Sequence, residues 1–462
     1  MQLPSLSFVQ NMAQKETTGL LVNDETISPV IQLSKRRWLV LGLFMLYGFS
    51  NQLQYVAYVT IVDQAKAFFS CTPAAINALA AIFPAIYVIF VFPGCKAYGS
   101  LGLRKGMLIG ATLNGLGSII KMVAAAAVPN FWLLVVANVF NAGAQVLFLG
   151  LPPMVASIWF PDDERTLATA LGTLTGFVGM ACGLFYSPRV LNGFPHSEKT
   201  GMTVLFATQA VASVLPMIGV FFFVSNAPPS PPSRTANSGA QSIPSILAVL
   251  KRYCTNKNFM VMAITFGAVV GLFTALATVL PQLLKPLGIG EDKTGVLSFV
   301  GILSGALSCA LTAPVIDKYR QYKKPWLLLL SLQCIFLAIM MVVVYAMDAP
   351  SVAASFVLII ALEMAMLPQF PVAMELAVEL TYPDSESLAG SALMVSLSFW
   401  SVIGTIVFSI ILGKNPTIGD TRLLLDVMMG VLVAVWLALV LFLKEDLRRL
   451  RHEKDGHEET TS

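Results

Sequence analysis

Twelve long apolar stretches follow one another along this chain of 462 residues, and they limit its possible folds more than any other feature. Each is long enough, at about 20 residues, for an α-helix to cross the hydrocarbon core of a bilayer. The stretches are 38–62, 73–94, 106–127, 131–157, 165–187, 202–225, 259–284, 293–315, 325–347, 352–374, 388–412 and 422–443. The sequence therefore predicts an all-α membrane protein with twelve transmembrane helices.

The composition agrees with this class, because 56% of the residues are hydrophobic, 12% are charged and the mean hydropathy is +0.76. A segment rich in Pro and Ser, residues 225–244, separates six stretches from the other six and predicts a flexible linker. After it, residues 245–254 alternate apolar and basic side chains in the manner of a short interfacial helix. The predicted division is an N-terminal tail 1–37, a six-helix half 38–225, a linker 226–257, a second six-helix half 258–443 and a C-terminal tail 444–462.

The basic residues predict the orientation. If both termini lie on one side, that side carries 21 of the 29 lysines and arginines. Because positive loops stay in the cytoplasm, we expect both termini and the linker to be cytoplasmic. The net charge of +4 then reflects topology, so a nucleic-acid partner is not expected.

Motifs for several other functions are missing from the sequence. There is no GxxxxGK[ST] loop and no triad-like set, and the six cysteines include no CxxC pair. We therefore expect no enzyme activity, no metal and no cofactor.

Polar amides interrupt the first apolar stretch, where Asn51, Gln52 and Gln54 fall within four residues. Helical spacing predicts one shared face for Asn51, Gln54, Tyr55 and Tyr58. Lipid cannot satisfy amides, so this face must form hydrogen bonds to other helices or line a wet cavity. Both interpretations remain open for each amide, and the stripe as a whole favours a cavity.

Other stretches carry similar faces. The fourth has Asn138, Asn141 and Gln145, and the seventh has Gly267, Gly271, Thr274, Thr278 and Gln282, which a packing face of small residues explains equally well. In the tenth, Pro368 and Pro371 predict a broken helix around Gln369. Lys121 and Glu363 are ionisable residues inside stretches, and Glu363 is a candidate proton relay or counter-charge.

Six plus six helices with a long central loop resemble the major facilitator architecture. The segment "APVIDKYRQYKK" is close to the loop motif of that superfamily and contains Asp317 and Arg320. The equivalent loop of the first half keeps Arg104 but has Gly99 where the motif usually has Asp. We expect Asp317, Arg320 and Arg104 to act as gating residues on the cytoplasmic side.

Three segments, "RRWLVLGLFMLYGFSNQLQYVAY", "AQVLFLGLPPMVASIWF" and "PVAMELAVELTYPDSES", resemble the feline leukaemia virus subgroup C receptor family. The resemblance implies a facilitator of choline and ethanolamine, with haem transport also attributed to the family, and solute contacts at Gln145 and Tyr55. This chain has Tyr55 where the family usually has Trp, Thr274 in place of an aromatic residue, and Ser398 in place of a Gln. The predicted substrate site comprises Asn51, Gln54, Tyr55, Tyr58, Asn141, Gln145, Thr274 and Ser398.

Three functions remain open: a facilitator of a small organic cation resembling choline or ethanolamine, a haem or porphyrin transporter, and a non-transporting receptor or scaffold. We favour the cation over haem, because no intramembrane His offers a haem ligand. We expect a monomer in the lipid bilayer of the plasma membrane. The acidic dileucine pattern "ETTGLL", residues 16–21, makes an endosomal or lysosomal membrane the alternative.

Overall fold

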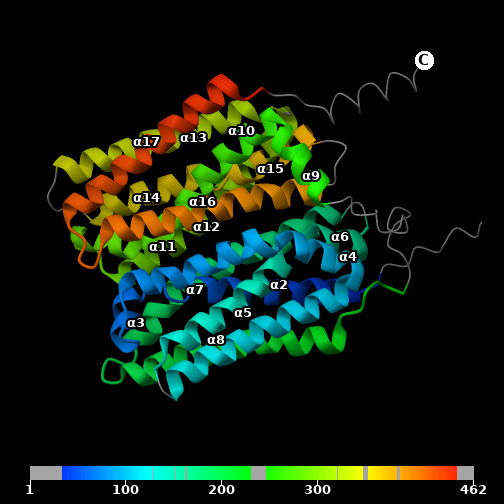
Figure 1. Cartoon of the computed structure of the whole chain (residues 1–462), viewed down its shortest axis with the longest axis horizontal. Helices are drawn as coiled ribbons and strands as arrows, with labels where there is room; N and C mark the ends of the chain where they lie inside the picture. Colours follow the sequence, from blue (N-terminus) through cyan, green and yellow to red (C-terminus); the bar gives the residue numbers. More distant parts are fainter. Residues whose placement is uncertain are drawn as a thin grey trace, which may run out of the picture.

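The computed structural model describes residues 34–127, 129–149, 151–161, 164–229, 246–319, 321–346, 352–381 and 386–444. Within these ranges every regular element is a helix. The long helices run side by side along the longest dimension of the molecule (Figure 1). The predicted all-α class is therefore confirmed.

The first half of the bundle, drawn in blue to green in Figure 1, contains seven helical elements. They are α2 (Arg36–Tyr55), α3 (Val62–Phe68), α4 (Pro73–Ala126), α5 (Phe131–Leu149), α6 (Pro152–Trp159), α7 (Arg165–Asn192) and α8 (Glu198–Phe223). The apolar stretches 73–94 and 106–127 are joined in α4, where Gly102 interrupts the helix with a φ of 77° and a ψ of 172°.

The second half follows the chain from α9 to α17. Its elements are α9 (Ile246–Thr255), α10 (Lys257–Phe266), the π-helical turn η2 (Gly267–Gly271), α11 (Leu272–Leu284), the 3₁₀ turn η3 (Lys285–Leu287), α12 (Glu291–Tyr319), α13 (Lys323–Ala346), α14 (Val352–Met366), α15 (Gln369–Thr381), α16 (Glu386–Leu412) and α17 (Ile418–Phe442). The helix predicted at 245–254 is α9. The proline-induced break in the tenth stretch is the gap between α14 and α15.

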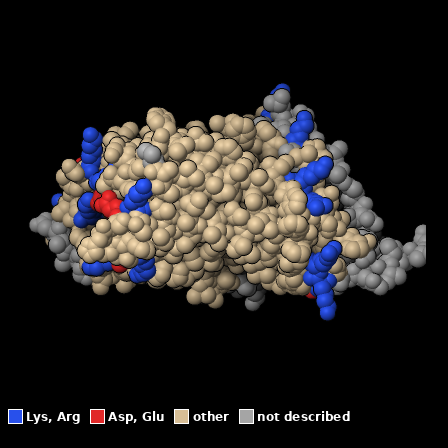
Figure 2. Space-filling view, turned by 90° about the horizontal axis from the view of Figure 1, so that it is seen from below, with Lys and Arg blue, Asp and Glu red and all other residues tan. Residues whose placement is uncertain are grey.

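Eleven helical segments of the described chain are long and apolar enough to cross a membrane. The remaining member of the bundle is α2, whose 20 residues include the amides that lower its hydropathy. Figure 2 shows charged side chains at the two ends of the visible face and a broad uncharged band between them. This distribution is expected of a protein surrounded by lipid.

Two helix pairs carry most of the packing between the halves. Helix α4 packs against α16, and α7 packs against α12. The buried residues of the largest apolar core, from Val249 to Leu443, belong to the second half, and Phe177 of α7 packs against them. We call the end of the molecule that carries α3 and η3 the α3 end, and the opposite end, with α6 and α9, the α9 end (Figure 1).

The prediction of one continuous helix over 38–62 is wrong. Helix α2 ends at Tyr55, residues 56–60 form turns, and α3 begins at Val62. Val56 has a φ of −96° and a ψ of 8°, which takes the backbone out of the α-helical region. Tyr58 therefore does not continue the helical face of Asn51, Gln54 and Tyr55.

Candidate functional site

Asn51 joins three helices of the first half. Its side-chain nitrogen donates to the Asn114 side-chain oxygen of α4 at 3.0 Å and to the Asn141 carbonyl oxygen of α5 at 2.9 Å. Asn51 is fully buried. The side-chain nitrogen of Asn51 therefore joins neighbouring helices through hydrogen bonds, which agrees with the interhelical interpretation of the polar stripe.

Gln54 is also fully buried, on the side of α2 that faces α4 and α8. Its side-chain nitrogen donates to Ser118 at 2.9 Å and to Ser213 at 3.4 Å. Its side-chain oxygen accepts from the Lys121 amine at 3.0 Å. Each polar atom of this side chain therefore has a partner within the first half.

Tyr55 lies where the two halves meet. Its ring centroid is 5.0 Å from that of Phe83, and it packs in a cluster that includes Ile302 of α12. Its hydroxyl interacts with the side chains of Thr278 in α11 and Ser401 in α16. Tyr55 is thus the residue of the predicted stripe that reaches from the first half to the second.

Gln52 is a further candidate site residue, which helical-face reasoning missed. Its side-chain oxygen accepts from Gln145 of α5 at 3.5 Å, and both residues are more than 90% buried. The sequence contained the signal, because Gln52 stands among the other amides of α2, but the stripe predicted from helical spacing left it out. Gln145 therefore lies opposite Gln52.

Tyr58 and Asn141 contribute to the interior of the first half. The Tyr58 ring packs edge-to-face on Phe206 of α8, with 5.8 Å between the ring centroids. The two side-chain polar atoms of Asn141 are buried and have no hydrogen-bond partner within the described chain. Its backbone carbonyl, by contrast, bonds Asn51.

The predicted site residues of the second half lie on three helices. Thr274 of α11 bonds the carbonyl oxygen of Val270 in its own helical segment at 2.8 Å. Ser398 is buried on α16. Glu363 of α14 is partly buried, and its side chain lies beside Gly301 of α12. No hydrogen bond or ion pair recorded in the described chain joins these three residues to one another.

The predicted gating residues have no described contact between the halves. Arg104 is exposed, and its guanidinium donates to the Phe221 carbonyl oxygen at the end of α8, within the first half. Arg320 and the side chain of Asp317 lie outside the described residues. The gating role of all three residues stays a prediction.

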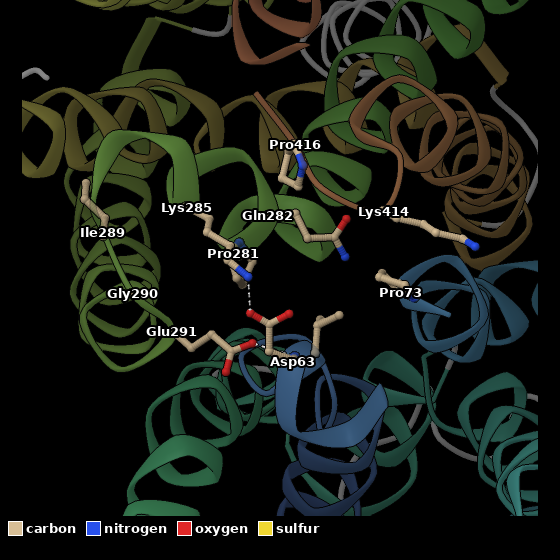
Figure 3. Close-up of a pocket in the computed structure, with 11 residues that line it drawn as sticks. Asp63, Pro73, Pro281, Gln282, Lys285, Ile289, Gly290, Glu291, Lys414 and Pro416 are labelled. Atoms are coloured by element: carbon tan, nitrogen blue, oxygen red, sulfur yellow. Dashed lines mark hydrogen bonds and ion pairs between the residues drawn. The ribbon is translucent and has the colours of Figure 1, made fainter. Parts of the chain in front are cut away.

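The α3 end holds the two halves together through Asp63 (Figure 3). The Asp63 carboxylate of α3 accepts from the Lys285 amine of η3, and its backbone N–H donates to the Glu291 carboxylate of α12 at 2.8 Å. A second lysine, Lys66, pairs with Asp63 from the same half. Burial alone would raise the pKa of Asp63, but hydrogen bonds and charge from Lys285 and Lys66 lower it below the ordinary value.

A pocket of about 70 Å³ adjoins this ion pair. Its lining combines apolar, amide and charged side chains from both halves: Val62, Asp63, Pro73, Pro281, Gln282, Lys285, Ile289, Gly290, Glu291, Lys414 and Pro416. Figure 3 shows the Asp63 and Lys285 side chains pointing toward each other at the pocket, joined by a dashed line. We call this ion pair and its surroundings the Asp63 closure.

Three further contacts cross between the halves near the α3 end. Gln282 of α11 donates to Asn77 of α4 at 3.1 Å, and Asn77 donates to Ser409 of α16 at 3.0 Å. Arg189 of α7 lies 3.7 Å from the carboxylate of Asp292 in α12. Apart from Gln282, the sequence did not indicate these residues, because hydropathy places charged residues outside the spans but does not show which of them meet.

The site chemistry suits reversible binding. An aromatic ring, apolar side chains and two hydroxyls surround Tyr55, and among the described residues no group of three or more His, Cys, Asp or Glu is placed to hold a metal ion. Such groups can orient a small polar solute, and the rings can contact a cation.

Known proteins resemble this chain over most of its length. The sequence description of the Major Facilitator Superfamily matches residues 40–409. The choline/ethanolamine transporter flvcr2a of Danio rerio is 28% identical over 435 residues, which are 92% of this chain and 90% of that protein. The choline/ethanolamine transporter FLVCR2 of Homo sapiens is 27% identical over 433 residues, covering 92% of this chain and 80% of the relative. The resemblance to the feline leukaemia virus subgroup C receptor family is therefore confirmed.

Solved structures share the fold at low sequence identity. A bacterial homolog of the human lysosomal transporter Spinster, inward-facing and occupied, matches with a TM-score of 0.65 and 13% identity, covering 89% of this chain and 96% of that one. A mutant of the nucleoside transporter NupG matches with a TM-score of 0.65 and 16% identity, covering 88% of this chain and 100% of that one. At these identities the likeness concerns the fold alone.

Proposed function

This chain belongs to the Major Facilitator Superfamily, and from that premise we propose that it carries a small organic cation of the choline and ethanolamine class by facilitated alternating access. It is a multi-pass integral membrane transporter, as its apolar helices and its family indicate. The relatives named as choline/ethanolamine transporters support the cation class.

One observation carries the assignment of the site. Tyr55 is the predicted solute contact that spans both halves, with Phe83 beside it and Thr278 and Ser401 opposite. A quaternary ammonium binds aromatic faces at about 0.5–2 kcal/mol per ring. A solute held by Tyr55 would contact both halves, which is the arrangement that alternating access around a fixed site requires.

Two amides support a polar end for the solute: Gln52, one turn before Tyr55 on α2, and its partner Gln145. Gln52 and Gln145 form one long contact of 3.5 Å with each other, so both retain hydrogen-bonding capacity for a hydroxyl or an amine. Choline and ethanolamine each combine a cationic nitrogen with a hydroxyl. The proposed pocket offers rings to the first group and amides to the second.

No comparable observation favours haem. The one histidine of the described ranges, His196, lies in the connection between α7 and α8 rather than in a membrane span. We therefore keep a single candidate function.

The proposed orientation has both termini in the cytoplasm, as the distribution of Lys and Arg predicts. In that orientation the α3 end faces away from the cytoplasm, so the Asp63 closure would belong to a state shut toward the outside. We keep the plasma membrane as the proposed location, with an endosomal or lysosomal membrane as the alternative, and we propose that the carrier acts as a monomer.

An uptake assay tests the proposed function. Cells lacking their own choline carriers, expressing this chain, should accumulate labelled choline in a saturable way, and excess unlabelled ethanolamine should compete. Labelled haem supplied to the same cells serves as the comparison. Saturable haem uptake without choline uptake, at equal surface expression, would overturn the proposal.

A further inference from the structure

Lys121 is a fully buried lysine in the second membrane-crossing part of α4. Its amine donates to two oxygens of Gln54, the backbone carbonyl at 3.1 Å and the side-chain oxygen at 3.0 Å. Across the described ranges, no carboxylate lies within ion-pair distance of Lys121. Its recorded partners are uncharged, and its two hydrogen bonds end on one residue of α2.

That residue stands at the end of a helix. The last carbonyls of an α-helix lack the N–H partners that a further turn would supply, and positively charged groups stabilise this end. After Tyr55 the chain turns away, and the backbone gives the Gln54 carbonyl only a long bond of 3.5 Å, from the Ala57 N–H of the turn. Lys121 supplies the short bond that this carbonyl would otherwise lack.

Lys121 also contacts the far side of the helix break. Its amine lies 4.9 Å from the centroid of the Tyr58 ring, which is within the range of a cation–π contact. One side chain from α4 therefore touches both Gln54 at the end of α2 and Tyr58 in the following turn. Tyr55, the residue that reaches the second half, lies between these two positions.

We infer that Lys121 is a positioning residue for solute binding: by holding Gln54 and Tyr58 on the two sides of the break, it fixes the direction in which Tyr55 projects between the halves. This inference rests on the proposed function, which assigns Tyr55 to the solute. Lys121 acts through Tyr55 and does not touch the solute, because its amine is used within the first half.

Three variants separate positioning from general packing. Lys121→Met keeps an unbranched side chain but removes the donors, Lys121→Gln restores an uncharged donor, and Ser118→Ala removes a different hydrogen bond to Gln54 while leaving its carbonyl capped. We expect Lys121→Met to raise the choline KM about five- to tenfold, with kcat per folded carrier nearly unchanged. Lys121→Gln should recover part of that loss, and Ser118→Ala should change KM less than about twofold.

A double-mutant cycle with Tyr55→Ala tests whether Lys121 acts through Tyr55. If Lys121 acts through Tyr55, Lys121→Met should change the choline KM little once Tyr55 is Ala, because coupled residues are non-additive. Equal effects of Lys121→Met in both backgrounds, or a lower folded amount with an unchanged KM, would overturn the inference. If Lys121→Met does not fold, Lys121→Gln takes its place in the cycle. A normal KM for Tyr55→Ala alone would instead overturn the proposed solute site.

Discussion

Asp63 contacts three charged residues at the α3 end, Glu291, Lys285 and Lys66, and it has one lysine partner in each half. Lys285 joins it across the halves and Lys66 joins it from one turn away on α3. The side chains in both pairs are 30% exposed or more, so water weakens each attraction. Exposed pairs of this kind contribute about 0.2–1 kcal/mol.

Replacing the two lysines should have opposite effects on the closure. Lys285→Ala removes the attraction between the halves and should favour opening of the α3 end. Lys66→Ala removes the competing partner and should strengthen the Asp63–Lys285 pair. We expect each change to shift the closed-to-open ratio by about two- to fivefold.

Distances between spin labels at Ala67 and Lys414, on opposite halves of the α3 end, would report the shift. The native cysteines would first be replaced by serine, and the unsubstituted chain with the same labels is the control. Shifts in the same direction for both lysine variants would contradict the role given to Asp63.

At the scale of elements, local signals predicted some helix breaks and missed others. Pro368 lies in the break between α14 and α15 and Pro371 in the first turn of α15, where the missing N–H of proline costs no helical hydrogen bond. The end of α2 at Tyr55 has no Gly or Pro within residues 55–60 to announce it. The Gln54 carbonyl at this end accepts a hydrogen bond from Lys121, which belongs to α4. Hydropathy therefore predicts the spans, whereas a break stabilised by tertiary contacts cannot be read locally.

The same limit applies to the site. Helical spacing selected Tyr55 and Gln145 as well as Asn51 and Gln54, because periodicity shows which residues share a face but not which helix that face meets. Asn51 and Gln54 turn out to bond neighbouring helices. The family resemblance, in contrast, singled out Tyr55 and Gln145.

Gly271 in the π-helical turn η2 has no Cβ, and this allows α16 to approach closely. A Cβ added at Gly271 would lie less than 2.5 Å from the Leu397 carbonyl oxygen, so Gly271→Ala must push the backbones apart. Overpacking of this kind costs about 1–3 kcal/mol, and the melting temperature of the purified carrier should fall. Gly430→Ala in α17 is the matched control, because its added Cβ meets nothing within 4 Å. Equal melting temperatures for the two variants would disprove the close-contact explanation.

At the scale of the whole molecule, transport requires the two halves to rock between a closed and an open α3 end. Asp317 is the predicted latch at the α9 end. Asp317→Ala should favour opening toward the cytoplasm and lower the turnover number more than the affinity for choline. Labelled-choline flux and binding, measured on the same membranes, separate the two effects. An equal loss of both would point to misfolding.

The driving force is a second property of the whole carrier. Glu363 is the carboxylate predicted inside a span, and it has no recorded partner of opposite charge within the described part of the chain. Transport should therefore follow the choline gradient, and a protonophore should leave the initial uptake rate unchanged within about twofold. Uphill accumulation that a proton gradient drives and Glu363→Gln abolishes would show instead that the carrier is proton-coupled.

Choline affinity and folded abundance, measured together on Tyr55 variants of the purified carrier, test the central claim most directly. If the ring faces a cation between the halves, Tyr55→Phe should be tolerated and Tyr55→Trp should bind choline at least as tightly. Tyr55→Ala should lose about 1–2 kcal/mol, roughly five- to thirtyfold in affinity, at similar abundance. A Tyr55→Ala carrier that folds poorly yet binds choline with unchanged affinity would contradict the account, because Tyr55 would then only hold helices together.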